Sequence, residues 1–443
     1  MKTFRIGGIH PPQNKLTAGM PVTVLDLPRR VQLPLQQHIG RPAVPCVKVG
    51  DTVARGQMVA RADGFVSAPV HASISGRVKA IGPIMNAAGY SIPAIEIEAD
   101  EEAHRADDVM RKAQIEFDTR QTDRSLSERH TPEELRRIIA DSGIVGLGGA
   151  AFPSTVKLSP KAGHEPELLI INACECEPYL TCDDALIRGY APRIAEGIEL
   201  MMSACGARRA VIGIEDNKPE AIAALRRTLD PAWPISIAVL KTKYPQGGEK
   251  QLVEAVTGRR IPSGGLPSDV GAVVNNVATA FAVYAAVLCG RPLIERVITV
   301  TGAAPVRGNF LVAVGTSISD VLGSVPDDVK VVVGGPMMGS SAVNLQAAVT
   351  KATSGLLVLA AGETRRLTPD PCIRCARCVE ACPMGLEPYL LSTCGRLRMW
   401  PEAAEARVLD CIECGSCSYI CPSSRPLLDY IRTAKSAVKT LNK

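Results

Sequence analysis

The chain has 443 residues, a length that predicts roughly three domains. Its content of 46% hydrophobic and 21% charged residues is ordinary for a globular protein and sufficient for sizeable cores. Aromatic residues make up only 4%, too few for base-stacking platforms, so we expect no nucleic-acid partner. The net charge of +5 is modest, and it is compatible with an anionic membrane face or partner without indicating one.

The first 15 residues, MKTFRIGGIHPPQNK, contain no apolar core of the kind that a signal peptide needs. We therefore expect the chain to stay in the reducing cytosol, where thiols stay reduced and disulfides are rare. The longest apolar stretch, VATAFAVYAAVLCG from Val277, is shorter than the about 20 residues of a membrane span. We predict a buried helix there, so any work at a membrane depends on partners.

Residues 1–98 are rich in Pro, Gly and Val, and turn signals recur every few residues, which predicts small β-strands. The segments GDTVARGQ and APVHASISGRV resemble the biotinyl/lipoyl carrier fold, a β-sandwich hybrid. A working carrier needs a lysine at the hairpin tip between them. Because none occurs between Lys48 and Lys79, we expect the fold without the swinging-arm function.

Residues 99–130 are highly charged and show no periodicity, which predicts a linker. The next segment, TPEELRRIIADSG, predicts a helix, with Thr131 as N-cap, Pro132 in the first helical position and Glu134 completing a capping box. It opens an α/β region that we expect to extend over residues 131–290.

A glycine-rich segment, GIVGLGGAAFPSTVKL, follows this helix. Backbone amides at Gly146, Gly148 and Gly149 could approach a phosphate closely, and Lys157 could add a positive charge. The pattern matches neither a standard Rossmann fingerprint nor a Walker loop, so an ordinary glycine-rich turn remains the alternative.

The apolar run ELLIINA predicts a buried parallel strand, and it leads into CECEPYLTCDD. Glu175 and Glu177 would then lie at the carboxyl end of a strand, where open α/β sheets bind ligands. Cys174, Cys176 and Cys182 could be metal ligands, but their spacing fits no cluster pattern, so we expect a structural role.

The strongest signal lies near the C-terminus, where CIRCARCVEACP and CIECGSCSYICP both have the pattern C-x2-C-x2-C-x3-C-P. This is the bacterial ferredoxin arrangement, in which the fourth cysteine of each run ligates the other 4Fe–4S cluster. Two zinc ribbons are the alternative, although structural zinc sites usually take two cysteines from each turn. Close clusters relay single electrons. The predicted ligand sets are Cys372, Cys375, Cys378 and Cys421 for one cluster, and Cys411, Cys414, Cys417 and Cys382 for the other.

The segments GLGGAAFPSTVK, NACECEP, YPQGGEKQL and NNVAT, in that order, resemble the flavin-binding core of the NADH-oxidising subunit of respiratory complex I. With both ends included, nearly the whole chain is similar to the RnfC family, the peripheral subunit of the Rnf ferredoxin:NAD⁺ oxidoreductase complex. The resemblance implies a multidomain α/β protein. The first part would be a barrel-sandwich hybrid (1–98), joined by the linker (99–130) to a Rossmann-like FMN/NADH-binding core (131–290). A β-grasp or SLBB domain (291–362) and an α-helical twin-cluster ferredoxin domain (363–443) would follow.

The resemblance also assigns roles to single residues around a non-covalently bound FMN and the substrate NAD(H). One group would hold the FMN phosphate and ribityl chain, a second would line the flavin, and a third would contact the nicotinamide nucleotide. These groups are, in order, Gly146, Gly148, Gly149 and Lys157; Asn172, Glu175, Asn275 and Asn276; and Glu177 and Glu249, with Phe152 packed against the nucleotide rings.

The sequence departs from the complex I motif at five positions of this core. Leu147 replaces an arginine, Ala151 and Thr155 replace glycines, Cys174 replaces an aspartate, and Gly248 replaces a glutamate. The flavin framework is kept better than the nucleotide contacts, so the motif predicts FMN more firmly than it predicts how NADH binds.

The implied function is electron transfer in a membrane-bound, ion-translocating ferredoxin:NAD⁺ oxidoreductase, with NAD(H) exchanging hydride at FMN and the clusters carrying single electrons. The expected partners are integral and peripheral membrane subunits of the Rnf complex, including a ferredoxin-like cluster-bearing subunit, with ferredoxin or flavodoxin acting indirectly. The expected place is the cytoplasmic face of the bacterial inner membrane. The alternatives are a soluble reductase of the cobalamin-reductase type, a cluster-bearing adaptor without flavin, and a zinc-bearing nucleic-acid module.

Overall fold

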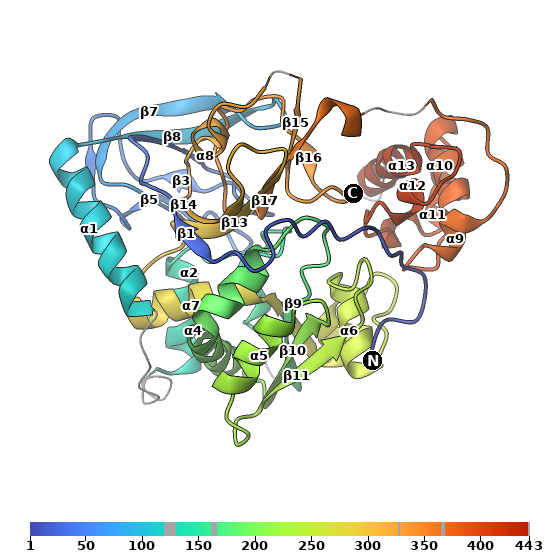
Figure 1. Ribbon diagram of the computed structural model, residues 1–443, viewed down its shortest axis with the longest axis horizontal. Helices are drawn as coiled ribbons and strands as arrows, with labels where there is room; N and C mark the ends of the chain where they lie inside the picture. The colour runs from blue at the N-terminus through green and yellow to red at the C-terminus, as the bar shows by residue number, and fades with distance from the viewer. Residues whose placement is uncertain (119–129, 161–165, 327, 365–367, 442–443) are drawn as a thin grey trace.

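The computed structural model describes residues 1–118, 130–160, 166–326, 328–364 and 368–441. Figure 1 shows a β-rich region at the upper left, an α/β region below it and a helical region at the right, with the first residues of the chain running between them. The fold is therefore mixed α/β, as the sequence predicts.

The N-terminal β region consists of two small antiparallel sheets, with strand orders β2-β8-β7-β4 and β3-β5-β6. Their inner faces share one apolar core that includes Val31, Leu33, Ile95 and Ile97, all 0% exposed. The short strands predicted from turn spacing are confirmed. They are β2 (Arg30–Pro34), β3 (Val44–Pro45), β4 (Thr52–Val53), β5 (Met58–Arg61), β6 (Val70–His71), β7 (Gly76–Met85) and β8 (Ser91–Ala99).

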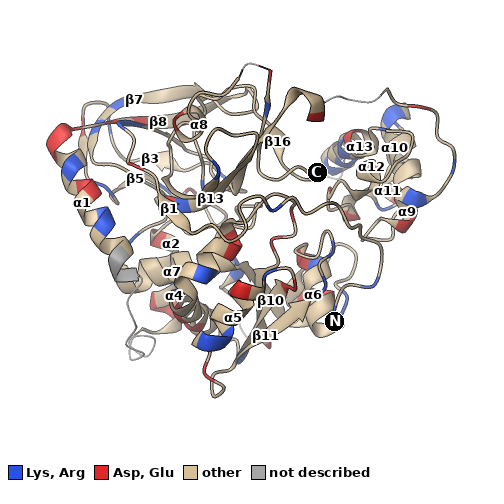
Figure 2. Cartoon of the chain, in the orientation of Figure 1, with Lys and Arg blue, Asp and Glu red and all other residues tan. Residues whose placement is uncertain are grey.

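The segment expected to be a linker differs from that prediction, because its first part forms helix α1 (Glu101–Asp118). Figure 2 shows acidic and basic residues along this helix, but one side of it is buried. Arg111 is 1% exposed and pairs with Glu295, and Asp107 accepts hydrogen bonds from Ser75. Charged residues can be buried when they are paired. The sequence prediction took the high charge as a sign of exposure, because the distant partner Glu295 cannot be recognised from composition. The rest of the expected linker, 119–129, lies outside the described residues.

The α/β region contains a four-stranded parallel sheet in the order β11-β10-β9-β12. The predicted capping box is confirmed, since Thr131 and Glu134 exchange hydrogen bonds at the start of α2. Ile170 and Ile171 on β9 are 0% exposed, and burying each such side chain stabilises the fold by about 1.5–3 kcal/mol. The elements are α2 (Pro132–Asp141), α3 (Ser154–Lys157), β9 (Leu168–Ala173), α4 (Cys182–Cys205), β10 (Arg209–Glu215), α5 (Pro219–Thr228), β11 (Ile235–Leu240), α6 (Glu249–Thr257), η2 (Pro267–Val270), β12 (Ala272–Asn276) and α7 (Val277–Cys289).

Helix α7 is the apolar stretch that the sequence analysis predicted to be a buried helix, and eight of its 13 residues are buried. It packs beside α4 on one face of the parallel sheet, while α6 covers part of the other face. Within the described part of the chain, no helix is both long and apolar enough to cross a membrane.

A six-stranded mixed sheet follows, in the order β1-β14-β13-β17-β15-β16. Its edge strand β1 comes from the N-terminal part of the chain and runs parallel to β14, so residues far apart in sequence complete this sheet. Its elements are β1 (Val22–Val24), β13 (Glu295–Gly302), β14 (Gly308–Ala313), α8 (Ile318–Leu322), β15 (Lys330–Val333), β16 (Ser340–Ser341), β17 (Gly355–Leu359) and η3 (Ala361–Glu363).

The C-terminal region is helical and contains both cysteine runs. Each run includes a short helix and is followed by a longer one, and the two longer helices, α10 and α13, contribute Leu391, Cys394, Ile431 and Val438 to a common core. The elements are α9 (Arg377–Glu380), α10 (Pro388–Leu397), α11 (Trp400–Glu405), η4 (Val408–Asp410), α12 (Ser416–Tyr419) and α13 (Leu427–Leu441).

Residues 1–20, here called the N-terminal strap, run outside the two small β-sheets although they belong to the segment predicted as the first domain. The strap bridges to the edge of the parallel sheet at Lys2–Leu240 and to the loop after β11 at Ile9–Tyr244. In Figure 1 it is the dark blue segment that passes between the helical region and the rest of the molecule before it enters β1. The strap therefore connects regions that the sequence analysis treated separately.

Candidate functional site: a flavin edge beside paired cysteine runs

The carboxyl ends of β9 and β12 bring together the asparagines that the resemblance assigned to a flavin. The two strands are adjacent and parallel, and Asn172 is the register partner of Asn276. Because β10 and β12 lie on opposite sides of β9, the order in which the parallel strands are added reverses at this point of the sheet. Open α/β sheets bind ligands at such a switch point, outside the carboxyl ends of the strands.

The glycine-rich segment forms a closed loop beside this edge. The amide of Gly146 donates to the carbonyl of Phe152 at 2.8 Å, and the tip of the loop is exposed. Gly149 has φ +112°, a conformation that L side chains rarely adopt, and a Cβ on Gly148 would lie 3.3 Å from the Cβ of Asn276. The glycines thus let bare backbone approach the asparagine edge, as a phosphate-binding role requires.

Two side chains in this edge have the properties expected of groups that hold a ligand. Asn275 is 3% exposed, yet neither its Oδ1 nor its Nδ2 has a hydrogen-bond partner among the described residues. Leaving such atoms unpaired costs about 1–3 kcal/mol, so a polar ligand would relieve the penalty. Lys157 donates to Glu249 at 2.6 Å and to the Val274 carbonyl at 3.2 Å, which places its ammonium at the same edge. These residues fit a flavin phosphate and ring.

Glu175 organises the start of helix α4. Its carboxylate accepts the amide protons of Asp183 at 2.7 Å and Asp184 at 3.3 Å. Burial raises the pKa of Asp183 to about 7, with the nearby Glu175 charge adding to the effect and a hydrogen bond from Asn276 opposing it. Glu175 therefore reaches the asparagine edge indirectly, through Asp183 and Asn276.

Glu177, assigned by resemblance to the nicotinamide nucleotide, contacts the mixed sheet region. Its carboxylate accepts the amide protons of Met337 at 3.1 Å and Met338 at 2.8 Å, in the loop between β15 and β16. Burial raises the pKa of Glu177 to about 7, although these two hydrogen bonds act in the opposite direction. Sequence motifs gave no signal for these methionine amides, because backbone donors carry no side-chain signature.

The three cysteines that follow β9 have separate partners and do not form a common thiol site. Cys174 is buried and lies near the Gly213 carbonyl, while the sulfur of Cys176 accepts the amide proton of Gly247 at 3.3 Å. Cys182 lies close to Glu175 and Asp183, so these three could in principle share an ion. Burial raises the pKa of Cys182, and the buried Arg296 guanidinium is close enough to lower it. A nearby guanidinium disfavours a cation, which agrees with a structural role.

The second cysteine run is largely shielded from solvent, and the four ligands predicted for its cluster lie around one small cavity. Cys382, Cys414 and Cys417 are 7–8% exposed, and Leu386, Leu391 and other apolar residues complete the wall. The cavity is lined by all four members of the crossed ligand set, Cys382, Cys411, Cys414 and Cys417. This arrangement supports crossed ligation.

The first run has the same local backbone but a different exposure. Arg374 and Ala376 have φ +56° and +59°, and the equivalent Glu413 and Gly415 have +57° and +77°. Positive φ is costly for residues other than glycine, so its repetition at matching positions indicates one loop shape built twice around two centres. Of the four cysteines predicted to hold the first cluster, Cys372 and Cys375 are exposed, and Cys378 and Cys421, the last cysteine of the second run, are partly buried.

A residue that sequence analysis did not single out joins the two sites. Tyr244, at the start of YPQGGEKQL, is 1% exposed, and its hydroxyl donates to the backbone carbonyl of Cys414 at 2.8 Å. Tyr244 also packs in one apolar cluster with Ile9, Ala381 and Cys414, to which Cys176 contributes. The second cysteine run therefore lies against the loop after β11, and the Gly247 carbonyl of that loop accepts a hydrogen bond from Asn172 of the flavin edge.

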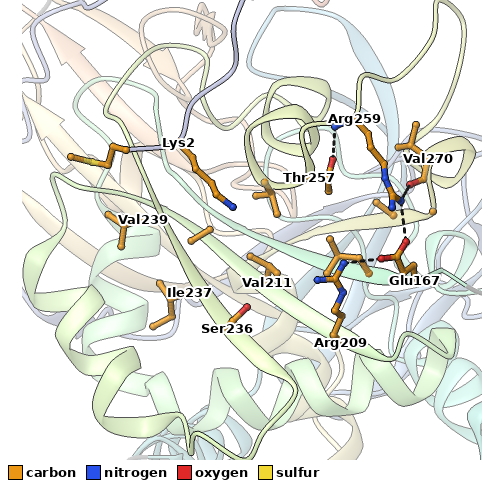
Figure 3. Close-up of a pocket in the computed structure, with 16 residues that line it drawn as sticks. Lys2, Glu167, Arg209, Val211, Ser236, Ile237, Val239, Thr257, Arg259 and Val270 are labelled. Carbon is orange, nitrogen blue, oxygen red and sulfur yellow. Dashed lines mark hydrogen bonds and ion pairs between the residues drawn. The ribbon is translucent and has the colours of Figure 1, made fainter.

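A larger groove, of about 560 Å³, lies elsewhere (Figure 3). It is lined by the amino-terminal parts of β9, β10 and β12, and its charged residues include Arg209 and Arg259, which both pair with Glu167. Since the asparagines lie at the opposite end of the same strands, this groove is separate from the flavin edge.

Comparison with known families and proteins agrees with both sites. Models described as the RnfC barrel sandwich hybrid domain, the Nuo51 FMN-binding domain and the 4Fe-4S dicluster domain match residues 2–102, 139–285 and 365–422. One subunit of the proton-translocating ferredoxin:NAD(+) oxidoreductase complex of Clostridium ljungdahlii is 42% identical over 98% of this chain and 94% of its own length. The corresponding subunit of the Na(+)-translocating complex of Acetobacterium woodii is 40% identical over 98% and 97%.

Among solved structures, the NAD+-reducing NiFe hydrogenase in its air-oxidized state aligns with a TM-score of 0.50 at 21% identity, over 77% of each chain, a likeness of fold alone. The chain has an FMN-binding domain and a 4Fe–4S dicluster domain, and this defines a flavin- and iron–sulfur-dependent electron-transfer protein. It belongs to the RnfC family, whose members are subunits of the ion-translocating oxidoreductase complexes, and the family predicted from sequence is confirmed.

Proposed function

We propose that this chain is the NAD(H)-linked electron-transfer subunit of a membrane-bound, ion-translocating ferredoxin:NAD⁺ oxidoreductase complex. The observation that carries the proposal is the contact between its two sites, in which Tyr244 of the flavin edge donates to the carbonyl of Cys414 at 2.8 Å. This contact places the second cysteine run next to the loop that bonds Asn172, so a cluster held there would be near enough to a bound flavin for electrons to pass within one chain.

At the flavin edge, FMN would supply the conversion between a two-electron hydride and single electrons. The residues present would bind and orient it: the amides of Gly148 and Gly149 with the Lys157 ammonium toward phosphate, and the amide group of Asn275 toward the flavin. Phe152 is partly buried beside this loop and could pack against a nucleotide ring. Asn172 and Asn276 fix the edge itself, through hydrogen bonds to Gly247 and Asp183.

The two carboxylates that the resemblance assigned to the nicotinamide nucleotide both have partners within the chain. Glu249 pairs with Lys157 and Glu177 is held by the Met337–Met338 loop, so neither carboxylate is directed only at a nucleotide. We assign Glu249 to the nucleotide side of the edge and Glu177 to the junction with the mixed sheet. We assign residues 291–362 to a β-grasp (SLBB) domain, which contacts the junction through the amides of Met337 and Met338 while Tyr244 joins the α/β region directly to Cys414.

The two cysteine runs would hold two 4Fe–4S clusters in an ordered relay. The cluster of Cys411, Cys414, Cys417 and Cys382 would exchange electrons with the flavin edge because it lies against Tyr244. The cluster of Cys372, Cys375, Cys378 and Cys421 would exchange electrons with a partner, because its loop is exposed and carries the exposed Arg374 and Arg377.

The partner we propose is a ferredoxin-like cluster-bearing subunit of the complex, with an acidic face that complements Arg374 and Arg377. Integral membrane subunits would then move Na⁺ or H⁺, and ferredoxin or flavodoxin would take part indirectly. This chain would lie peripherally on the cytoplasmic face of the bacterial inner membrane.

The test is an anaerobic purification followed by flavin extraction, iron determination and addition of NADH. We expect bound FMN, on the order of eight irons per chain for two clusters, and fast bleaching of flavin followed by the clusters. Iron without flavin would overturn the proposal in favour of an adaptor. Activity as a free enzyme, without co-purifying membrane subunits, would favour a reductase of the cobalamin-reductase type.

A further inference from the structure

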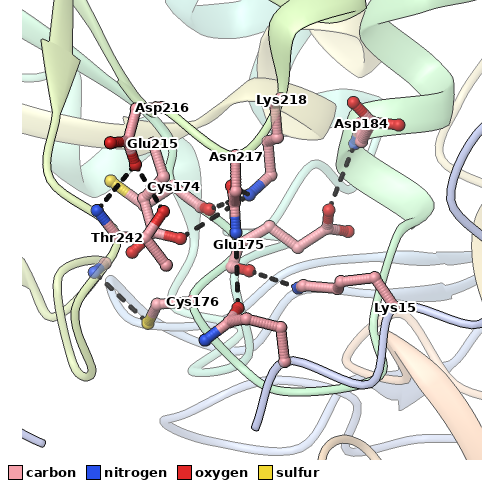
Figure 4. A network of polar contacts seen from close by, with 12 residues as sticks. Lys15, Cys174, Glu175, Cys176, Asp184, Glu215, Asp216, Asn217, Lys218 and Thr242 are labelled. Atoms are coloured by element: carbon pink, nitrogen blue, oxygen red, sulfur yellow. Dashed lines mark hydrogen bonds and ion pairs between the residues drawn. The ribbon is translucent and has the colours of Figure 1, made fainter. Parts of the chain in front are cut away.

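The N-terminal strap is anchored on the loop after β9 by Lys15. The Lys15 ammonium donates to the backbone carbonyls of Glu175 and Glu177, both at 2.8 Å, and of Leu180 at 2.6 Å. Figure 4 shows Lys15 reaching from the strap to the backbone of Glu175. Three carbonyls held by one ammonium fix the path of this loop, which contains the residues that follow the flavin asparagine of β9.

The other end of the strap lies on the cysteine run that crosses over to the buried cluster. The amide of Gly8 donates to the carbonyl of Ala381 at 3.0 Å, next to the ligand Cys382. Gly7 has φ +64°, and a Cβ on it would overlap the carbonyl oxygen of Cys382 and lie 2.8 Å from the nitrogen of Pro383. Backbone therefore contacts backbone here, at a distance that only glycine permits.

Between its two ends the strap pairs with the residue that joins the two sites. Ile9 and Tyr244 exchange two backbone hydrogen bonds, each 2.9 Å long, and the Tyr244 hydroxyl donates to the carbonyl of Cys414. Other contacts also join the flavin core to the helical region, such as Gln251 to the Pro383 carbonyl at 3.3 Å. The strap differs from these because it contacts the flavin loop and two parts of the cluster-binding backbone at once.

We propose that the N-terminal strap is a positioning element that sets the separation between the flavin edge and the buried cluster, with Gly7 as its contact on the cluster side. The inference rests on the proposed function, since it concerns the transfer of electrons between those two centres. Gly7 and Lys15 touch neither the proposed cofactor atoms nor a substrate. They act through the Cys382 carbonyl and the Glu175–Leu180 loop.

The substitution that tests the strap is Gly7→Ala. Its methyl group would push the strap away from Cys382, because the obstructing atoms are backbone and cannot rotate aside. Two controls match its backbone strain without the overlap. Gly19, in the same strap, has φ +78° and nothing within 4 Å of its Cβ position, and Gly385, in the helical region, has φ +64° with its nearest neighbour, Ile6, at 3.9 Å.

The three variants would be purified with flavin and clusters, and mixed with NADH in an anaerobic stopped-flow instrument. In Gly7→Ala we expect flavin bleaching at the wild-type rate and cluster bleaching slower by several-fold, because the rate of electron transfer falls as the distance between two centres grows. Gly19→Ala and Gly385→Ala should bleach both centres as the wild type does. Equal slowing in all three variants, or no slowing in Gly7→Ala, would overturn the proposal.

A second measurement does not depend on turnover and separates this inference from the proposed function. Amide hydrogen exchange at Gly8, Ile9 and Tyr244 should rise in Gly7→Ala and stay at the wild-type level in Gly19→Ala, because those amides form the strap's bonds. Failure of NADH to bleach wild-type flavin would reject the proposed function while leaving the exchange result to judge the strap. Unchanged amide exchange in Gly7→Ala would show that Gly7 does not hold the strap in place, and it would overturn the positioning role proposed for the strap.

If Gly7→Ala does not fold, Lys15→Met serves instead, because it releases the flavin-loop end without adding a clash. We expect normal iron content, faster exchange at the Tyr179 amide, which donates to the Gln13 carbonyl, and slower cluster bleaching. Wild-type cluster bleaching together with raised exchange would show that the strap can loosen without consequence, and would overturn the proposal.

Discussion

The two cysteine runs are nearly identical in spacing and backbone conformation, but the rest of the molecule treats them differently. The run from Cys411 to Cys421 is contacted by Tyr244 of the α/β region and lies close to Met337 of the mixed-sheet region. The run from Cys372 to Cys382 exposes Cys372 and Cys375 and sends only its last cysteine into the buried cavity.

The comparison shows how a repeated motif acquires two roles. Spacing fixes the shape of a ligand loop, and this is why positive φ recurs at Arg374 and Glu413. Surroundings decide which centre faces the flavin and which faces outward. Even the matching residues differ in their contacts, since Glu413 pairs with Arg432 and Lys435 beside its own run, whereas Arg374 is exposed.

The largest effect is expected from Cys382→Ser, because this cysteine of the first run is predicted to ligate the cluster of the second run. Cys382 is the last cysteine of the first run but lines the same cavity as Cys411, Cys414 and Cys417 of the second. The variant should lose or alter the buried cluster, lowering iron from about eight toward about four per chain, while the exposed cluster keeps its EPR signal. Cys394→Ser, at a buried cysteine of the same helical core outside both runs, is the control. Loss of the exposed cluster instead would mean that ligation is not crossed.

A smaller effect is expected from Glu177→Gln, because Glu177 holds the Met337 loop that lies against the second cysteine run. Glu177 holds the Met337 amide, and the Met337 carbonyl lies 3.0 Å from a Cβ position on Gly415. Burial raises the pKa of Glu177 to about 7, above the about 4.3 of an unfolded chain, so the folded protein binds this proton more tightly. Its contribution to stability is therefore present below about pH 4.3 and is lost as pH rises through about 7.

Gln stays neutral, so the stability of Glu177→Gln should fall less with pH than that of the wild type. The difference should grow to on the order of 2 kcal/mol between pH 5 and pH 8, below the full linkage value because the site is only partly buried. Denaturant unfolding across that range measures it, with Glu405→Gln on exposed α11 as control. If the free energy of unfolding changed with pH in the same way in wild type and variant, the raised pKa of Glu177 would be contradicted. The same variant should retain FMN, and flavin loss would place Glu177 in the flavin site.

The smallest effect is expected at the exposed run, from the double variant Arg374→Gln with Arg377→Gln. Rim charges mainly change association rates, so electron transfer to the partner should slow by about two- to tenfold at low salt and become less salt-dependent. Bleaching by NADH within the chain should not change. Arg432→Gln removes a similar charge beside the buried run and serves as control. An equal effect of Arg432→Gln would locate the docking surface elsewhere.

Much of the site could be predicted from sequence because its signals are local. The capping box at Thr131, the strand before Asn172 and the cysteine spacing each depend on residues within one turn or one strand. The helix at residues 101–118 was missed for the opposite reason, since burial of Arg111 requires Glu295, far away in the sequence. The strap was missed because its bonds join backbone atoms, which leave no mark on residue type beyond two adjacent glycines.

The sequence by itself identified the family, which is confirmed, and it predicted the cluster cysteines and the segments of the flavin edge, because each depends on residue type at fixed spacing. Only the tertiary structure decided which cysteine run faces the flavin, where Glu177 is directed and that residues 1–20 tie the two sites together. These are contacts between segments hundreds of residues apart. They follow from how the regions pack, and no local pattern encodes that.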